Sequence, residues 1–301
     1  MSTLIIATAI IQQTLSGAVP LAVAGCGELL AQRAGVINVG IEGLMLTGCI
    51  AGFAVASLTG SIWLAVLAAM LAAGVLAAIF AVVTIFARVD QIVTGMAINL
   101  IAVGASGTIW ELLQARGLDR LAPGIGWEPF GPGVFHQHGL FWIALICLML
   151  AGLLLRRTRA GIIIAAIGDA PDAAAANGIA VRRWRFGLVV NAGLFAGLAG
   201  AFLSVMRTHG FVPEMTGSQG FLVLALVIFG RWTAAGLGLG CLLFGAITAI
   251  QQHCQAAGWT SFIPYQVFTG LPYVVALIAL CITYGRNVGP LTLNQPWPRQ
   301  R

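Results

Sequence analysis

The chain contains no lysine, and it has little charge of either sign. Only 8% of its 301 residues are charged and 59% are hydrophobic, whereas a soluble domain carries about a quarter charged residues. So few charges could not cover the surface of a soluble protein, and the composition indicates a protein of the bilayer. Because the P-loop motif GxxxxGK[ST] requires lysine, the missing lysine also excludes ATP binding by that motif.

Catalytic and metal-binding patterns are missing as well. No Ser-His-Asp or HExxH pattern occurs, and the cysteines form no CxxC or Cys/His spacing. We therefore expect no cofactor, no metal site and no enzymatic activity of the chain itself, with an intramembrane enzyme or a scaffold as the alternative from another class. The cysteines lie in or beside apolar runs and are interpreted as packing residues: Cys26, Cys49, Cys147, Cys241, Cys254 and Cys281.

The chain has long stretches without any charge. Residues 43–87, 91–110, 186–206 and 232–285 contain no Asp, Glu, Lys or Arg. A spanning helix needs about 20 apolar residues, and these runs lack the period-2 alternation of a membrane β-barrel. We predict one all-α polytopic membrane domain over residues 1–301, with about nine (8–10) transmembrane helices, the seventh short enough for a half-helix. The predicted spans are 3–24, 36–57, 61–87, 91–110, 138–155, 187–206, 217–230, 234–252 and 265–284.

Fifteen arginines give the chain a net charge of +6. They stand at the ends of apolar runs and form no basic face, so they indicate membrane topology and not nucleic-acid binding. With nine spans, a cytoplasmic C-terminus and an outside N-terminus place twelve arginines in inner loops and three in outer loops, as the positive-inside rule requires. The inner set is Arg33, Arg88, Arg156, Arg157, Arg159, Arg182, Arg183, Arg185, Arg231, Arg286, Arg299 and Arg301; the outer set is Arg116, Arg120 and Arg207.

Two short segments occur twice. Residues 91–96 (QIVTGM) match 266–271 (QVFTGL) at three of six positions, and residues 40–43 (GIEG) correspond to 217–220 (GSQG) at nearly the same offset. By the predicted topology the first copy starts a helix running outward and the second a helix running inward, which predicts inverted repeats of the kind found in transporters. Chance similarity is the alternative. The predicted repeats cover about 25–110 and 211–285.

Polar side chains near the repeat starts are candidates for lining a solute path. Glu42 stands just inside an apolar run, where a carboxylate normally faces a cavity or the bundle interior; pairing with Arg33 or capping a neighbouring helix is the alternative. For the amides the alternative is interhelical hydrogen bonding, at roughly 0.6–2 kcal/mol each. The candidates are Asn38, Glu42, Gln91, Asn99, Gln219 and Gln266.

The predicted inner loop 156–186 contains a short helix-forming segment. Asp169 can cap a helix that has Pro171 near its first turn, alanines favour the helix, and Gly178 supplies a stop. Alanines such as Ala174 would also leave a small, smooth surface for the groove of a partner. On these features alone the segment could equally be a connector.

These segments together resemble the permease subunits of ABC importers for purine nucleosides and simple sugars, which are related to ribose and branched-chain amino-acid permeases. The likeness lies mainly in residues 27–43, 168–179 and 217–232, and it covers most of the chain. It departs at Gln219, where relatives often carry a basic residue, so a solute contact there would differ in charge.

The resemblance implies a subunit that forms the translocation path for a small polar solute in the bacterial inner membrane. It implies three protein partners: a cytoplasmic ABC ATPase, a second homologous permease in a heterodimer, and an extracytoplasmic solute-binding protein. It also implies alternating access driven by ATP hydrolysis in the partner. The residues implied to dock on the ATPase are Asp169, Pro171, Ala174, Gly178 and Ile179.

The solute is left open by the residues. A purine nucleoside or a simple sugar is favoured, and an aromatic slot for a nucleoside could come from Trp110, Phe211 and Phe221. An amino acid or a nucleobase is the alternative solute. An ion-coupled secondary transporter is the alternative mechanism, for which Glu42 would be the acidic site.

The predicted topology can be tested by cysteine labelling in a cysteine-free background. Single cysteines in 121–135 should react with an impermeant thiol reagent in intact cells, because that loop is predicted to lie outside. Single cysteines in 170–180 should react only after permeabilisation. The reverse pattern would contradict both the orientation and the inverted repeats.

Overall fold

The computed structural model describes residues 2–119, 139–256, 270, 274, 289–295 and 297, and within these ranges all regular structure is helical. Two π-helical segments, η1 (Val82–Phe86) and η3 (Phe202–Arg207), continue α3 and α8. The helices are α1 (Ser2–Arg33), α2 (Ile41–Thr59), α3 (Ile62–Ala81), α4 (Gln91–Ala115), α5 (Gly139–Arg157), α6 (Arg159–Asp169), α7 (Pro171–Ala176), α8 (Val181–Ala201), α9 (Gln219–Phe229) and α10 (Ala234–Ala256).

Seven of the described helices are long and apolar enough to cross a bilayer: α1, α2, α3 with η1, α4, α5, α8 with η3, and α10. α9, at 11 residues, is too short to cross, in agreement with the short seventh span that the sequence predicts. The first eight predicted spans each coincide with one of these helices, α9 included, whereas the ninth, 265–284, lies outside the described residues apart from 270 and 274. The protein is therefore a multi-pass, all-α membrane protein.

The predicted boundary between the first two spans is wrong by several residues. α1 continues to Arg33 instead of ending near residue 24, and α2 begins at Ile41 instead of residue 36. The polar residues Glu28 and Gln32 stay inside α1 because they are four apart on one helix face and bond to each other, with Gln32 Nε2 donating to Glu28 Oε1 at 3.0 Å. Mutual hydrogen bonding thus keeps polar groups within a long buried helix.

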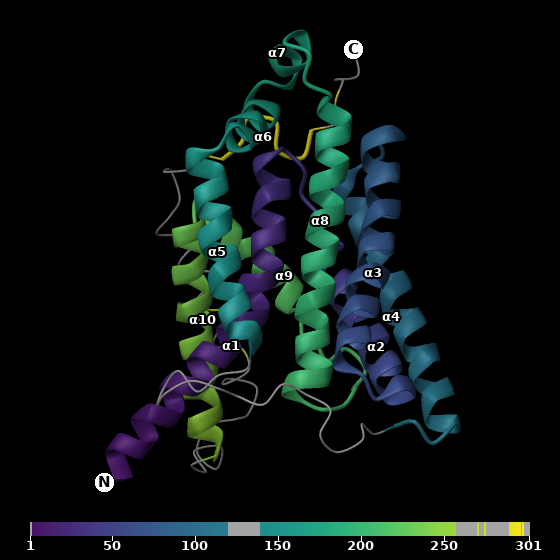
Figure 1. Ribbon diagram of the computed structural model, residues 1–301, viewed down its shortest axis with the longest axis vertical. Helices are drawn as coiled ribbons and strands as arrows, with labels where there is room; N and C mark the ends of the chain where they lie inside the picture. The colour runs from purple at the N-terminus through teal and green to yellow at the C-terminus, as the bar shows by residue number, and fades with distance from the viewer. Residues whose placement is uncertain are drawn as a thin grey trace.

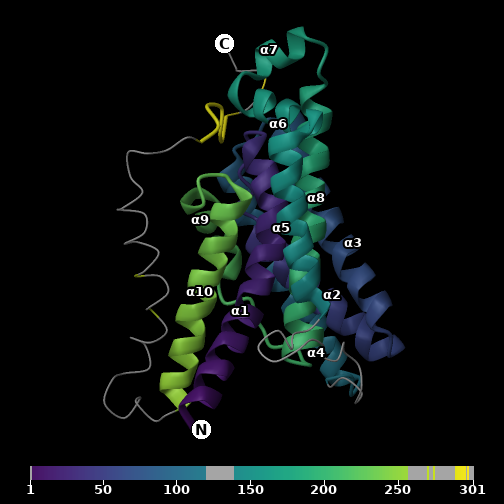
Figure 2. The ribbon, with the colours of Figure 1, turned by 60° about the vertical axis from the view of Figure 1, so that its left-hand side comes forward.

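The helices form a bundle with α6 and α7 at one end, called here the α7 end, and the start of α1 at the other (Figure 1). In the turned view, α9 and α10 lie on one side of α1, and α2, α3 and α4 on the other (Figure 2). The central helices are α1 and α8: 78% of the apolar stretch of each is buried, against 17% for α5 and 28% for α4. The peripheral helices therefore present apolar side chains to lipid.

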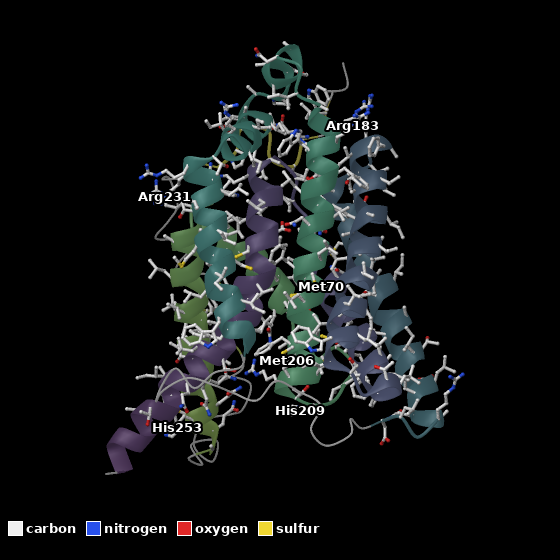
Figure 3. All side chains as sticks on the ribbon, in the orientation of Figure 1. Met70, Arg183, Met206, His209, Arg231 and His253 are labelled. Carbon is white, nitrogen blue, oxygen red and sulfur yellow. The ribbon has the colours of Figure 1, made fainter. Side chains whose placement is uncertain are left out.

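The labelled polar side chains fall at the two ends of the bundle. Arg183 and Arg231 lie in the half nearer α7, and His209 and His253 lie at the opposite end, while Met70 and Met206 lie between the ends (Figure 3). The labelled arginines and histidines thus lie toward the two ends of the bundle, and the labelled methionines lie between them.

α8 packs closely on α2 and α3 because small residues line the contact. A Cβ at Gly197 would overlap the carbonyl oxygen of Ala69 and stand 2.9 Å from the Cβ of Ala73. A Cβ at Gly48 in α2 would stand 2.6 Å from the Cα of Gly197. With Gly193 one turn earlier, this is the small-xxx-small pattern that lets membrane helices approach to backbone contact.

We predict that Gly197→Ala destabilises the bundle, because the added methyl group meets backbone that cannot move aside. The apparent thermal unfolding midpoint of the detergent-solubilised protein should fall. Gly187→Ala on the same helix is the matched control, since nothing lies within 4 Å of a Cβ there. The control should match the wild type or exceed it, because alanine favours a helix over glycine by about 1 kcal/mol. Equal midpoints for the two variants would contradict the packing described here.

Candidate functional site

An irregular segment, residues 36–40, enters the bundle between α1 and α2 and is held by two amide side chains of α4. Gln91 Oε1 accepts a hydrogen bond from the backbone N–H of Ile37 at 2.8 Å. Asn99 donates through Nδ2 to a carbonyl of the segment at 3.0 Å and accepts through Oδ1 from the N–H of Gly43 at 2.8 Å. Non-helical backbone inside a membrane protein must be satisfied by the protein itself, and these two side chains meet that requirement.

Glu42, in the first turn of α2, binds the start of α9. Its carboxylate accepts from the hydroxyl of Thr216 at 2.5 Å, from the N–H of Ser218 at 2.9 Å and from the N–H of Gly220 at 2.6 Å. Gly220 allows this approach, because a Cβ there would stand 2.6 Å from the Cα and the nitrogen of Glu42. A carboxylate between two helix N-termini neutralises the positive ends of both dipoles.

A buried polar group connects α1 to the turn between α9 and α10. Glu28, Gln32 and Asn38 have no exposed surface. Glu28 Oε1 accepts from Gln32 and from the N–H of Asn38 at 3.2 Å, and Gln32 Oε1 accepts from the indole Nε1–H of Trp232 at 3.0 Å. Trp232 reaches this position from a backbone with φ +51°, next to Arg231 at +53°. Two left-handed residues in succession form the sharp turn that aims the indole inward.

Sequence reasoning did not select Glu28, Gln32 or Trp232 as site residues. Glu28 and Gln32 stand four residues apart in an apolar run, which is the available signal for a shared buried face. Nothing in the sequence near Trp232 indicates that its partner lies 200 residues earlier. Only the fold brings these residues together.

Five of the six predicted path residues fall within the described part of the chain. Four of them, Asn38, Glu42, Gln91 and Asn99, lie where α2 meets α4 and the start of α9, called here the junction. Asn38, Gln91 and Asn99 are at most 8% exposed, and their hydrogen bonds to backbone are of the structural kind that is the alternative to a solute contact. Glu42 caps a neighbouring helix, which was its alternative. Among the described residues, two of the predicted path residues keep a buried amide atom without a hydrogen-bond partner: Asn38 at Nδ2, and Gln219, the first residue of α9, at Oε1. Gln266 lies outside the described residues.

Two of the three predicted aromatic residues lie together near the end of the bundle opposite α7. The rings of Trp110 and Phe211 have centroids 5.4 Å apart, and Phe53 packs edge-on against Trp110 at 5.6 Å. Phe211 is only 3% exposed, so the cluster is closed in this conformation. Phe221, on α9, is 37% exposed. The cluster joins α2, α4 and the loop before α9.

The short helix predicted in the loop 156–186 is confirmed as α7, but its start is not the predicted one. Asp169 is the last residue of α6, and its carboxylate accepts from the N–H of Leu291 at 3.3 Å instead of capping α7. Pro171 occupies the first turn of α7 as predicted. The helix ends in a Schellman motif, with Gly178 at φ +81° donating to Ala175 and Ile179 donating to Ala174.

Ala174, which the resemblance implies as an ATPase contact, faces the bundle in this chain, and its docking on a partner stays a prediction. It is 4% exposed and packs with Ala34, Ile164, Ile167 and Val181. An amphipathic helix buries one side, and this residue falls on that side. The exposed residues of α7 and its C-cap are Asp172, Ala173, Ala176 and Asn177.

Comparison with known proteins identifies the class of protein that has this architecture. Residues 10–280 match the family model described as the permease component of a branched-chain amino acid transport system. The chain belongs to this family, and it is a transport subunit of the ABC-importer permease class.

The similarity to individual relatives extends over most of the chain. It is 30% identical to the guanosine ABC transporter permease protein of Bacillus subtilis, over 96% of both chains. It is 29% identical to the nucleoside ABC transporter permease protein of Lactococcus lactis, over 93% of this chain and 94% of that protein. It is 32% identical, over 83% of this chain and 79% of that protein, to a Haloferax volcanii protein with the provisional name of glucose ABC transporter permease.

We predict that Glu42→Gln destabilises the junction, because an amide NH₂ replaces one acceptor and faces N–H or O–H donors of the α9 start. Leaving such donors unpaired costs about 1–3 kcal/mol, and the apparent unfolding midpoint in detergent should fall accordingly. Glu111→Gln is the control, because that carboxylate is exposed on α4. A midpoint unchanged by Glu42→Gln would show that the contact with α9 contributes no stability.

Proposed function

We propose that this chain forms the translocation path of an ATP-driven importer for a purine nucleoside or a simple sugar. The main support is the similarity along nearly the full chain to relatives named for guanosine and nucleoside transport, together with a relative named for glucose. The aromatic cluster of Trp110 and Phe211 is closed in this conformation, and on opening it would offer flat apolar surface of the kind that stacks on a base or a sugar ring. An amino acid or a nucleobase is the alternative solute.

The path runs between two inverted repeats, about 25–110 and 211–285, within a bundle of about nine spans. The contact of Glu42 with Ser218 and Gly220 supports this proposal, because the matching segments 40–43 and 217–220 touch each other. Helices α2 and α9 begin at this contact, and half-helix N-termini at a repeat interface are typical of transporter binding sites. Gln219 is the residue we propose as a solute contact, since its buried amide oxygen has no hydrogen-bond partner among the described residues and it stands at the start of α9.

The remaining machine is proposed from family membership and from the arginine distribution. The α7 end faces the cytoplasm of the plasma membrane, with the N-terminus outside and the C-terminus inside. An ABC ATPase docks on the exposed side of α7, a second homologous permease completes the path in a heterodimer, and a solute-binding protein delivers the solute outside. ATP binding by the partner then re-orients the two repeats.

Reconstitution tests the proposal directly. In proteoliposomes with its cognate ATPase and binding protein, the chain should take up labelled guanosine or a labelled simple sugar when ATP is supplied on the α7 side, and the isolated chain should hydrolyse no ATP. Ala176→Arg should abolish uptake and ATPase association at equal membrane abundance, because that position is exposed on α7. Uptake driven by an ion gradient without ATP would overturn the proposal in favour of a secondary transporter.

A further inference from the structure

The described C-terminal residues, 289–295 and 297, lie against the α7 end of the bundle and are called here the C-terminal strap. Thr292 is 5% exposed. Its N–H and its hydroxyl both donate to the carbonyl of Gly168 at the end of α6, at 3.0 and 2.7 Å. The last carbonyls of a helix have no partner within the helix, so Thr292 of the strap satisfies one of these carbonyls of α6.

A buried arginine fixes the strap to two further helices. Arg185, in the first turns of α8, is 3% exposed. Its guanidinium donates to the carbonyl of Ala34 after α1 at 2.9 Å, to the carbonyl of Ile167 in α6 at 3.4 Å, and to Thr292 and Gln295 of the strap at 3.1 and 3.3 Å. Only the branched, five-donor head of arginine can serve so many acceptors in one plane.

The room for this guanidinium comes from a glycine. Gly35 has φ +89°, and a Cβ there would stand 2.7 Å from Nη2 of Arg185 and 3.1 Å from the hydroxyl of Thr292. The carbonyl of Gly35 also accepts from the N–H of Asn294 at 3.2 Å. The turn after α1 is therefore shaped to receive both the arginine and the strap.

The strap then reaches α7 itself. The indole Nε1–H of Trp297 donates to the carboxylate of Asp172 at 2.7 Å. Trp297 also packs against the cluster that holds Ala174. α7 has six residues, far below the roughly 12 that an isolated helix needs to be even marginally stable, so its orientation depends on such contacts.

We propose that the C-terminal strap positions α7 for force transfer, with Arg185, Thr292 and Trp297 as positioning residues for energy coupling. This inference rests on the proposed function, in which α7 is the contact of the ATPase. When the ATPase moves α7, the strap carries that motion to the ends of α1, α6 and α8 through direct hydrogen bonds. Without the strap, α7 is held only by one buried side and turns without moving the bundle.

The test compares the hydrogen bond between Trp297 and Asp172 with a strap residue whose side chain is mostly exposed. Trp297→Phe removes the indole donor and keeps an aromatic ring, and Asp172→Ala removes the same bond from the other partner. Leu291→Ala is the control in the strap, because that side chain is 75% exposed. The readout is the factor by which loaded binding protein stimulates ATP hydrolysis by the assembled complex, together with solute transported per ATP hydrolysed.

We expect each strap variant to lower this stimulation and the transport per ATP on the order of fivefold, the change expected from losing one typical hydrogen bond at an exposed position. The double variant should be no worse than either single one, because both remove one bond. Asp172→Asn, which keeps an acceptor oxygen, should retain most of the coupling, and Leu291→Ala should match the wild type. Arg185→Lys should lower the transport per ATP, whereas Arg183→Lys, on the exposed side of α8, should leave it unchanged.

The outcomes separate the strap from the proposed function. Full coupling in both Trp297→Phe and Asp172→Ala would overturn the strap proposal and leave the importer intact. Normal ATPase association in Ala176→Arg would instead overturn the assignment of α7 as the ATPase contact. If Trp297→Phe fails to reach the membrane, the effect of Asp172→Ala at equal abundance decides the matter.

Discussion

The rest of this bundle depends on one carboxylate inside it. Glu42 binds the first residues of α9 from the first turn of α2, so that two helices that begin within the protein share a single negative charge. Two helix N-termini facing each other would repel through their positive dipole ends, and a carboxylate between them converts this repulsion into attraction. Gly220 is required at the contact because the two backbones meet there without space for a side chain.

The same junction explains why polar residues stand in an otherwise apolar sequence. A membrane protein can begin a helix in its interior only when other groups satisfy the backbone before that helix. Gln91 and Asn99 do this for residues 36–40, and Glu42 does it for the start of α9. Most of the amides thus serve the scaffold, and Gln219 keeps an unpaired oxygen within it.

The junction and the α7 end are connected through the end of α1. Trp232, just after α9, binds Gln32, and two residues further along the chain, just after α1, the carbonyl of Ala34 accepts a hydrogen bond from Arg185. Arg185 binds the C-terminal strap, and the strap binds α7. Hydrogen bonds and the backbone between them therefore connect α7 to α9, whose first residues bind Glu42.

The sequence by itself determined the membrane environment, the class of protein and most of the helices. The absence of lysine and the charge-free stretches indicate spanning helices, seven of which the described part of the structure confirms, and the segments 27–43, 168–179 and 217–232 lead to the permease family. The length and apolar character of a span are local properties, and a chain in a bilayer has few other ways to satisfy its backbone. This is why those predictions succeed.

The tertiary structure decided which side each residue presents and what it binds. Ala174 turns inward, Asp169 binds the strap instead of capping α7, and Glu42 meets residues more than 170 positions later. Periodicity could not indicate these outcomes, because α7 is too short to show a pattern and because a hydrogen bond between distant segments leaves no trace in either segment alone. The bonds of Arg185 to Ala34, Ile167 and Thr292 form only once the helix ends have been brought together. Two of these acceptors are backbone carbonyls, which every residue has, so no sequence pattern marks them.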